Sequence, residues 1–135
     1  MVDEVERTNG RLDVAVANAG TIMIGPAVHI TPQDEHEAMD TMYWGVVHLA
    51  RAAMPHLSGS ANGRFVTIGS IGGKVPVPHL LPYTAAKAAA MAYSETLRAS
   101  WGDRGVRVVT VVPGLMRTGS HAHALTKGRH AMEYR

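Results

Sequence analysis

The chain contains three short apolar runs, and each run ends in small or turn-forming residues. The runs cover residues 13–17, 65–68 and 106–112, and their endings are Asn18-Ala19-Gly20, Gly69-Ser70 and Pro113-Gly114. Runs that are rich in β-branched residues and apolar on both faces are typical of parallel strands covered on both sides. The pattern therefore predicts three parallel strands.

Between the first two runs, apolar positions repeat with a helical period from Thr31 to about Leu57. The hydroxyl of Thr31 can cap the helix, Pro32 suits its first position, and Asp34 supplies a carboxylate at the third. These signals predict a long helix. A second helix is predicted to begin near Pro82 or Tyr83 and to reach about Trp101. The stops that end it are two glycines, Gly102 and Gly105.

The order of strand, helix, strand, helix, strand indicates a right-handed parallel α/β unit. No linker, repeat or low-complexity segment interrupts it. We therefore predict a Rossmann-like parallel sheet with flanking helices, as one domain over residues 1–135. Ligands of open α/β sheets bind outside the carboxyl ends of the strands, so the three small-residue endings are expected to border one crevice.

Composition narrows the class of protein. The 135 residues are 46% hydrophobic and 18% charged, with a formal net charge of +2, which fits a globular protein. Cysteine is absent, which excludes disulfides, thiol nucleophiles and cysteine-based zinc sites. The Lys and Arg residues are scattered and form no basic stripe, so we expect no nucleic-acid partner.

The sequence predicts neither a membrane span nor a signal peptide, because no run of about 18 apolar residues is present and the N-terminus is polar. A cytoplasmic location is the resulting expectation. His121, His123 and His130 are close in sequence, but no matching carboxylate or second histidine pair stands at a defined spacing. Solvated loop histidines explain them better than a metal site, and no metal is predicted.

Tyr83 and Lys87 are four residues apart in the second predicted helix, so both can lie on one helix face. An ammonium near a phenol favours the phenolate, which suits acid/base work at neutral pH. Ser70 could hydrogen-bond the same substrate oxygen. A phenol that exchanges a proton at oxygen complements a nicotinamide that exchanges a hydride at carbon. Taken alone, the spacing is more simply explained by an amphipathic helix with a half-buried tyrosine and a solvated lysine.

The wider set of motifs resembles the short-chain dehydrogenase/reductase family. The matching residues follow the family's order over nearly the whole chain: Asn18-Ala19-Gly20, Trp44-Gly-Val-Val-His48 with Met54-Pro55, Ser70, Tyr83-Thr-Ala-Ala-Lys87, and Pro113-Gly114 with Thr118. The resemblance implies an enzyme that uses NAD or NADP to interconvert an alcohol and a carbonyl in a small-molecule substrate. It also implies a homo-oligomer formed through the two long helices, since the small residues from Ala85 to Ala92 permit close approach.

The resemblance assigns roles to individual residues. Ser70 would position the substrate oxygen, Tyr83 would be the acid/base, and Lys87 would favour the phenolate and hold the nicotinamide ribose. The Asn18-Ala19-Gly20 turn would pass close to the ribose on the adenosine side of the cofactor. Pro113, Gly114 and Thr118 would line the nicotinamide end. Cofactor-binding residues are thus expected at Asn18, Ala19, Gly20, Tyr83, Lys87, Pro113, Gly114 and Thr118.

The chain departs from the family at the position of a catalytic asparagine, three residues before Gly45. Met42 stands there instead. The asparagine normally holds a water that links the lysine to solvent as a proton relay, and methionine cannot hold that water. The relay is therefore absent or rerouted, or the alignment slips at this point.

A second departure is the lack of the glycine-rich turn, Thr-Gly-x-x-x-Gly-x-Gly, that holds the pyrophosphate. The glycines at 69–73 and 114–119 do not have its spacing. The chain is therefore expected to be about half of a doubly wound domain, the middle of a longer enzyme, with weak cofactor binding and little activity by itself. Without a neighbouring strand, Val14, Ala15 and Val16 are expected to form an exposed apolar edge.

Two functional hypotheses result. The first is an NAD(P)-dependent short-chain oxidoreductase, represented here by its catalytic half. The second is a non-catalytic remnant of such an enzyme that acts as an oligomerisation partner. The presence of Ser70, Tyr83 and Lys87 favours the first, and the absent glycine-rich turn together with Met42 favours the second.

Overall fold

The computed structural model describes residues 1–117, 119 and 123–128. A three-stranded sheet forms its centre, with β1 (Val14–Ala17), β3 (Arg64–Ile68) and β4 (Arg107–Val111) parallel in the order β1-β3-β4. In this register Val14 pairs with Arg64, and Arg64 pairs with Arg107. The three predicted parallel strands are therefore confirmed.

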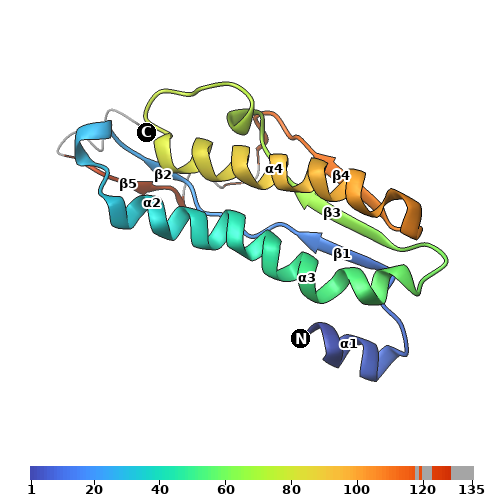
Figure 1. Ribbon diagram of the computed structural model, residues 1–135. Helices are drawn as coiled ribbons and strands as arrows, with labels where there is room; N and C mark the ends of the chain where they lie inside the picture. The colour runs from blue at the N-terminus through green and yellow to red at the C-terminus, as the bar shows by residue number, and fades with distance from the viewer. Residues whose placement is uncertain (118, 120–122, 129–135) are drawn as a thin grey trace.

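Two long helical segments lie side by side across one face of the sheet (Figure 1). The first consists of α2 (Pro32–Met39), a π-helical turn η2 (Asp40–Trp44) and α3 (Gly45–Ser58), and the second is α4 (Leu81–Trp101). Both helical segments predicted from the apolar period are confirmed. The π-helical turn between α2 and α3 is not predicted.

The predicted helix ends are also present. Thr31 Oγ1 accepts a hydrogen bond from Asp34 N at 3.3 Å, and the Asp34 carboxylate accepts one from Thr31 N at 2.9 Å. These two bonds form a capping box, which satisfies backbone donors that the first helical turn leaves free. At the far end of α4, Gly102 is the C-cap and Gly105 adopts a left-handed φ of 75° after the short 3₁₀ turn η4 (Gly102–Arg104).

Several shorter elements are not indicated by the sequence pattern. They are α1 (Val2–Asn9), β2 (Met23–Ile24), the 3₁₀ turns η1 (Ala27–His29) and η3 (Ile71–Gly73), and β5 (Leu125–Thr126). β2 and β5 pair in parallel as a separate two-stranded sheet. Each of these two strands is two residues long, so neither shows an alternation that the sequence could reveal.

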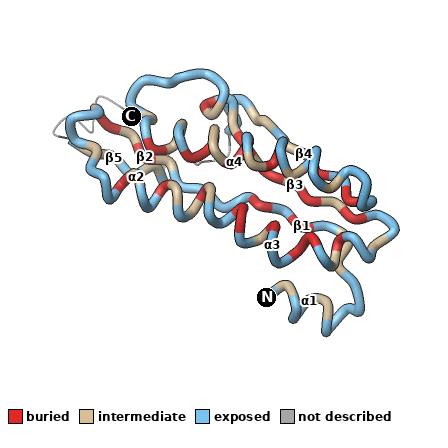
Figure 2. Tube along the Cα trace, in the orientation of Figure 1, coloured by how far each residue is buried: buried red, intermediate tan, exposed pale blue. Residues whose placement is uncertain are grey.

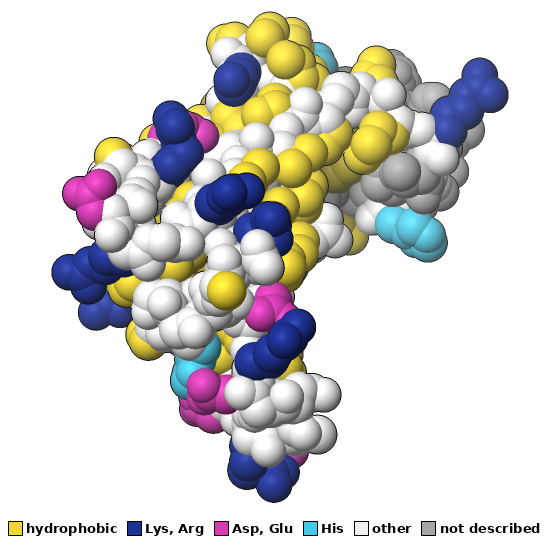
Figure 3. Space-filling model, turned by 90° about the vertical axis from the view of Figure 1, so that its right-hand side faces the viewer, with side chains coloured by type: hydrophobic (Ala, Val, Ile, Leu, Met, Phe, Trp, Pro, Cys, Tyr) yellow, Lys and Arg dark blue, Asp and Glu magenta, His cyan; other side chains and the backbone are white. Residues whose placement is uncertain are grey.

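The helices cover one face of the central sheet and leave the other face open (Figure 2). The buried side chains on the covered face are Ala15, Ala17, Phe65, Thr67 and Val108. On the open face Val14, Val16, Val109 and Val111 are between 41% and 51% exposed. Figure 3 shows a band of hydrophobic side chains on this side of the molecule. The strands predicted to be covered on both sides are therefore covered on one side only, within the described residues.

β1 is an edge strand, as expected, but its apolar residues do not all lie exposed. Val14 and Val16 are 47% and 51% exposed, whereas Ala15 is only 7% exposed. Successive side chains of a strand point to opposite faces, and Ala15 points into the core that α3 shares. The expectation of an exposed run from Val14 to Val16 is therefore wrong at Ala15.

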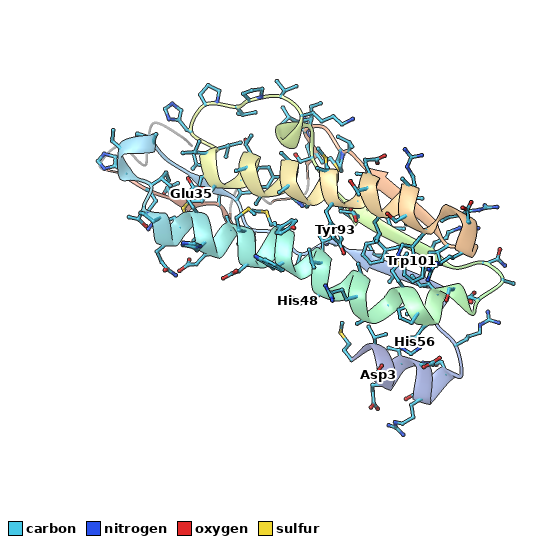
Figure 4. The ribbon with its side chains drawn as sticks, in the orientation of Figure 1. Asp3, Glu35, His48, His56, Tyr93 and Trp101 are labelled. Carbon is cyan, nitrogen blue, oxygen red and sulfur yellow. The ribbon has the colours of Figure 1, made fainter. Side chains whose placement is uncertain are left out.

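α1 contains no fully buried residue, and it meets the rest of the molecule through the partly buried Val2 and through charged side chains. His56 of α3 lies between two α1 carboxylates, with Nδ1 2.6 Å from Glu6 Oε2 and Nε2 3.3 Å from Asp3 Oδ1 (Figure 4). Both ring nitrogens act as donors only in the imidazolium form. The hydrogen bond to Glu6, aided by the charges of Glu6 and Asp3 and opposed by desolvation, raises the pKa of His56.

We expect the contact between α1 and α3 to weaken as the pH rises. The pKa of His56 in the folded protein lies above its unfolded value of about 6.5. The charged contact therefore contributes its full stability below pH 6.5, and this contribution is lost as the imidazolium deprotonates through the folded-state pKa. Hydrogen exchange of the α1 amides, corrected for the intrinsic rate, should show falling protection. His56→Gln should remove the protection of α1 at acidic pH. The control His48→Gln should leave that protection unchanged, because the His48 ring stacks on Trp44. Equal protection of α1 at acidic and alkaline pH would contradict this expectation.

Candidate active site

Ser70 and Tyr83 meet at Gly72. Ser70 follows β3 and caps η3, where its Oγ accepts a hydrogen bond from Gly72 N at 3.1 Å. Tyr83 lies in the first turn of α4. A Cβ atom on Gly72 would lie 3.3 Å from Tyr83 Cε1 and 3.5 Å from Ser70 Oγ. The fold therefore brings these two predicted site residues to one point, and the glycine leaves room for both.

Lys87 is buried one turn further along α4. The residue is 6% exposed, and its Nζ donates a hydrogen bond to the carbonyl oxygen of Ile68 at 2.7 Å. The same Nζ lies 6.0 Å from the centroid of the Tyr83 ring. Burial lowers the pKa of Lys87, because desolvation disfavours the charged form. A solvated lysine, the simpler interpretation of the four-residue spacing, is therefore ruled out.

Gly20, in the turn after β1, lies beside the ammonium of Lys87. A Cβ atom on Gly20 would lie 3.5 Å from Lys87 Nζ and 3.5 Å from Met42 Sδ, so the three residues enclose one small space. Asn18 and Ala19, which precede Gly20 in this turn, are exposed. The predicted Asn18-Ala19-Gly20 segment thus lies at the edge of the sheet where Lys87 is held.

Met42 lies within this site, on the π-helical turn. It is 1% exposed and packs in an apolar cluster with Ala38, Ala86 and Tyr83. Met42 therefore borders Gly20 together with Lys87 and belongs to the cluster against which Tyr83 packs. An apolar side chain occupies the place where the resemblance leads one to expect an asparagine.

The segment after β4 joins the site through its backbone. The carbonyl oxygen of Pro113 accepts a hydrogen bond from Ile71 N at 2.9 Å, and that of Val111 accepts one from Gly69 N at 2.8 Å. The end of β4 is thereby tied to the segment that carries Ser70. Gly114 follows and is exposed, and Thr118 lies outside the described residues.

A cavity of about 260 Å³ adjoins Tyr83. Its other walls include Thr21 and Leu125, and the carboxylates and hydroxyl of Glu37, Asp40 and Thr41. A wider hollow of about 510 Å³ lies around Arg11, Asp13 and Arg64, next to the amino ends of the strands. The smaller cavity adjoins the candidate site, because Tyr83 lies in its wall, whereas Ser70 and Lys87 do not line it.

Asp40 and Thr41 are site residues that the sequence does not reveal. They belong to the π-helical turn η2, which ends where Gly45 N–H bonds to the carbonyl oxygen of Asp40. Such turns are frequent at functional sites. The apolar period runs through the turn without interruption, so no residue pattern marks it.

An ion pair between the buried Asp34 and the partly exposed Lys127 lies in one wall of the cavity. Asp34 Oδ1 lies 3.0 Å from Lys127 Nζ, and its other oxygen accepts hydrogen bonds from Thr31 N and Oγ1. The backbone hydrogen bond from Thr31, with a further contribution from Lys127, lowers the pKa of Asp34 to about 2. Because Lys127 directly follows β5, the pair ties the two-stranded sheet to α2.

Among the described residues, no group of three His, Asp or Glu side chains is placed to hold a metal ion. His121 and His130 lie outside those residues. The same part of the chain contains no helix that is both long enough and apolar enough to cross a membrane.

Comparison with known proteins gives the family. The profile of the short chain dehydrogenase family matches residues 1–128, and the chain belongs to that family. A short-chain dehydrogenase from Streptomyces avermitilis superimposes with a TM-score of 0.85 at 29% identity, over 94% of this chain and 48% of that one. Gluconate 5-dehydrogenase from Burkholderia cenocepacia, solved with NADP and tartrate, gives 0.83 at 28% identity, over 89% and 47%.

A curated relative shows the same partial overlap. Dehydrogenase/reductase SDR family member 7B of Danio rerio is 32% identical over 123 residues, which is 91% of this chain and 40% of the relative. The chain thus spans less than half the length of these proteins. The predicted family and the predicted Rossmann-like parallel sheet, as part of a longer fold, are confirmed.

Proposed function

We propose that the protein is a cytoplasmic, NAD(P)-dependent oxidoreductase that interconverts an alcohol and a carbonyl in a small-molecule substrate, with Tyr83 as the acid/base. One observation carries the proposal. Ser70 and Tyr83 converge on Gly72, and the buried ammonium of Lys87 lies beside the Tyr83 ring, at the carboxyl edge of the sheet. Membership of the short chain dehydrogenase family supports the class of reaction.

The side chains divide the work of the reaction. In carbonyl reduction, Ser70 Oγ holds the substrate oxygen beside Tyr83, and Tyr83 donates its phenolic proton to that oxygen. The nicotinamide, when bound, supplies the hydride to the carbonyl carbon. Lys87, held in place by the carbonyl oxygen of Ile68, stabilises the phenolate that remains on Tyr83. In alcohol oxidation the phenolate takes up the proton instead.

The residues around Lys87 fit the ribose of a nicotinamide nucleotide. An ammonium has three donors, and Lys87 gives one to Ile68, which leaves two for ribose hydroxyls. Gly20 has no side chain to fill the space beside Nζ. Pro113 and Gly114 lie near the same edge, through the bond from Ile71. We propose Asn18, Ala19, Gly20, Tyr83, Lys87, Pro113, Gly114 and Thr118 as the residues that contact NAD or NADP.

The test is a redox assay of the full-length protein with NADH or NADPH and a panel of small ketones and aldehydes. We expect one of the two nucleotides to be consumed in a one-to-one ratio with the alcohol formed. Residues 1–135 produced alone are expected to bind either nucleotide weakly, because they contain no glycine-rich turn for the pyrophosphate. Nucleotide binding to the full-length protein without turnover on any carbonyl would contradict the proposal.

A second candidate function is that of a non-catalytic oligomerisation partner. The open apolar face of the sheet and the methionine at position 42 favour it. Both candidates include a homo-oligomer formed through the two long helical segments, where Trp44 is 44% exposed. Sedimentation of the full-length protein, combined with the assay above, separates them, since an oligomer without turnover supports the second candidate.

A further inference from the structure

A catalytic Tyr83 has to exchange a proton with solvent in every turnover. In carbonyl reduction the phenolic proton moves to the substrate oxygen, and the tyrosine remains as a phenolate until one proton returns to it. In alcohol oxidation one proton leaves by the same path. Under the proposed function, therefore, a route for protons must lead from the Tyr83 hydroxyl to the surface.

Among the described residues, the side chains around Lys87 do not offer this route. Within the described part of the chain, its ammonium bonds to the backbone carbonyl of Ile68, and the ammonium and the Met42 thioether both border Gly20. Neither a thioether nor a peptide carbonyl carries a proton that can be passed on. Met42 is 1% exposed and Ala86 is fully buried beside it, so apolar atoms close this side.

The cavity that Tyr83 lines has the opposite character. Its volume of about 260 Å³ has room for several water molecules, each of which occupies roughly 30 Å³ in the liquid. Thr41, which is half-buried, and Asp40, which is exposed, stand in its wall on the π-helical turn. The cavity therefore connects the half-buried Tyr83 to the solvent-exposed carboxylate of Asp40.

The charged groups around Tyr83 differ in whether they already form hydrogen bonds or ion pairs. Lys87, on α4, is bonded to Ile68, and Asp34, on α2, is paired with Lys127 and bonded to Thr31. Glu37, also on α2, accepts a hydrogen bond from Gln33 Nε2 at 3.1 Å. Of the three carboxylates in the cavity wall, only Asp40 has a side chain without a hydrogen bond or ion pair among the described residues.

We propose that water in this cavity carries the proton between Tyr83 and solvent, with the Thr41 hydroxyl as an intermediate and the Asp40 carboxyl as the group that exchanges with bulk water. In carbonyl reduction, the Asp40 carboxylate takes a proton from solvent and passes it to the water chain, and the last water gives one to the phenolate. The proposal rests on the proposed role of Tyr83 and makes Asp40 and Thr41 positioning residues for its proton transfer.

The test compares Asp40→Asn, Thr41→Val and the control Glu35→Gln in the full-length enzyme with nucleotide and its carbonyl substrate. Glu35 lies on α2 but does not line the cavity. For Asp40→Asn we expect kcat to fall about tenfold, since general acid–base catalysis as a whole contributes 10²–10⁴-fold. KM and nucleotide affinity should stay unchanged, the solvent deuterium isotope effect on kcat should increase, and imidazole should restore the rate. Thr41→Val should lower kcat in the same way, and Glu35→Gln should not.

Asp40→Glu, which retains a carboxylate, should keep most of the rate and its dependence on pH. An Asp40→Asn enzyme with normal kcat and isotope effect would overturn the route. A loss of rate that imidazole does not restore, with an unchanged isotope effect, would show a structural role for Asp40 and would overturn it as well. Full turnover by Tyr83→Phe would instead defeat the proposed function, so the two failures are distinguishable.

Discussion

Replacement of Tyr83 by Phe in the full-length protein should abolish turnover and leave nucleotide binding largely intact. The substitution removes the hydroxyl that exchanges a proton with the substrate, and such groups contribute about 10²–10⁴-fold to the rate. The ring remains available for its contacts with Met42 and Gly72, so the site should keep its shape. Steady-state kinetics and nucleotide titration of the same preparation measure both effects.

Tyr93→Phe is a matched control for this prediction. Tyr93 lies on the same helix (Figure 4), and its ring makes an edge contact with that of Tyr43 at a centroid distance of 6.1 Å. Desolvation, partly offset by the charge of Arg51, raises the pKa of Tyr93, so its phenol is less suited to accept or release a proton at neutral pH. Loss of its hydroxyl should leave kcat unchanged. Unchanged turnover of Tyr83→Phe would exclude the acid/base assignment.

Replacement of Lys87 by Met should remove both turnover and nucleotide affinity. Methionine fills a similar volume but offers no donor to ribose hydroxyls and no positive charge to the Tyr83 phenolate. Hydrogen bonds of charged groups contribute about 1.5–3 kcal/mol each, which corresponds to a loss of roughly 10–100-fold in nucleotide affinity for one bond. Titration with NADH and NADPH, together with kcat, checks the prediction.

The substitution also acts on the fold. The carbonyl oxygen of Ile68, a half-buried residue, loses the donor that Lys87 supplies at 2.7 Å, and the loss costs at most the roughly 1–3 kcal/mol of a fully buried acceptor without a partner. Removal of a buried ammonium offsets part of this cost, because burial already disfavours its charged form. Thermal unfolding should therefore show modest destabilisation. Lys74→Met, at an exposed lysine after η3, should change neither stability nor affinity. A Lys87→Met protein with normal nucleotide affinity would contradict the ribose contact.

The contrast between the two variants separates two roles. Tyr83→Phe is expected to lose turnover but keep its nucleotide affinity. Lys87→Met is expected to lose both turnover and nucleotide affinity. The same pattern at both positions would indicate that one substitution disturbs the whole edge of the sheet. The difference arises because the phenol exchanges a proton during the reaction, whereas the ammonium also holds the nucleotide before it.

Local patterns were sufficient for the parallel sheet and the two long helical segments. Thr31, Pro32 and Asp34 predict the start of a helix. The hydrogen bonds between Thr31 and Asp34 form within one turn, and both are present in the structure. The β-branched runs likewise predict strands from their own composition. β2 and β5 are different, since each consists of two residues that become a strand only by pairing with the other. A pattern within either segment cannot show that pairing.

The candidate site divides in the same way. Ser70, Tyr83 and Lys87 stand at spacings that the sequence displays, and their resemblance to a family suggested what they do. The convergence of Ser70 and Tyr83 on Gly72 requires η3 to fold against α4, which the spacing does not specify. Asp40 and Thr41 reach the cavity because η2 is a π-helical turn, and the apolar period passes through it unchanged.

The amino-acid sequence by itself determined the class of fold, the order of the strands and helices, and the identity of the tyrosine, lysine and serine at the candidate site. Those features depend on neighbours within a few residues, where propensity and spacing act directly. Only the tertiary structure decided that Lys87 is buried, that Ala15 faces the core and that one face of the sheet is open. It also decided that Met42 and Lys87 meet at Gly20 and that Asp40 and Thr41 border the cavity. Burial and contact depend on segments far apart in the chain, so they are settled only when the helices pack on the sheet.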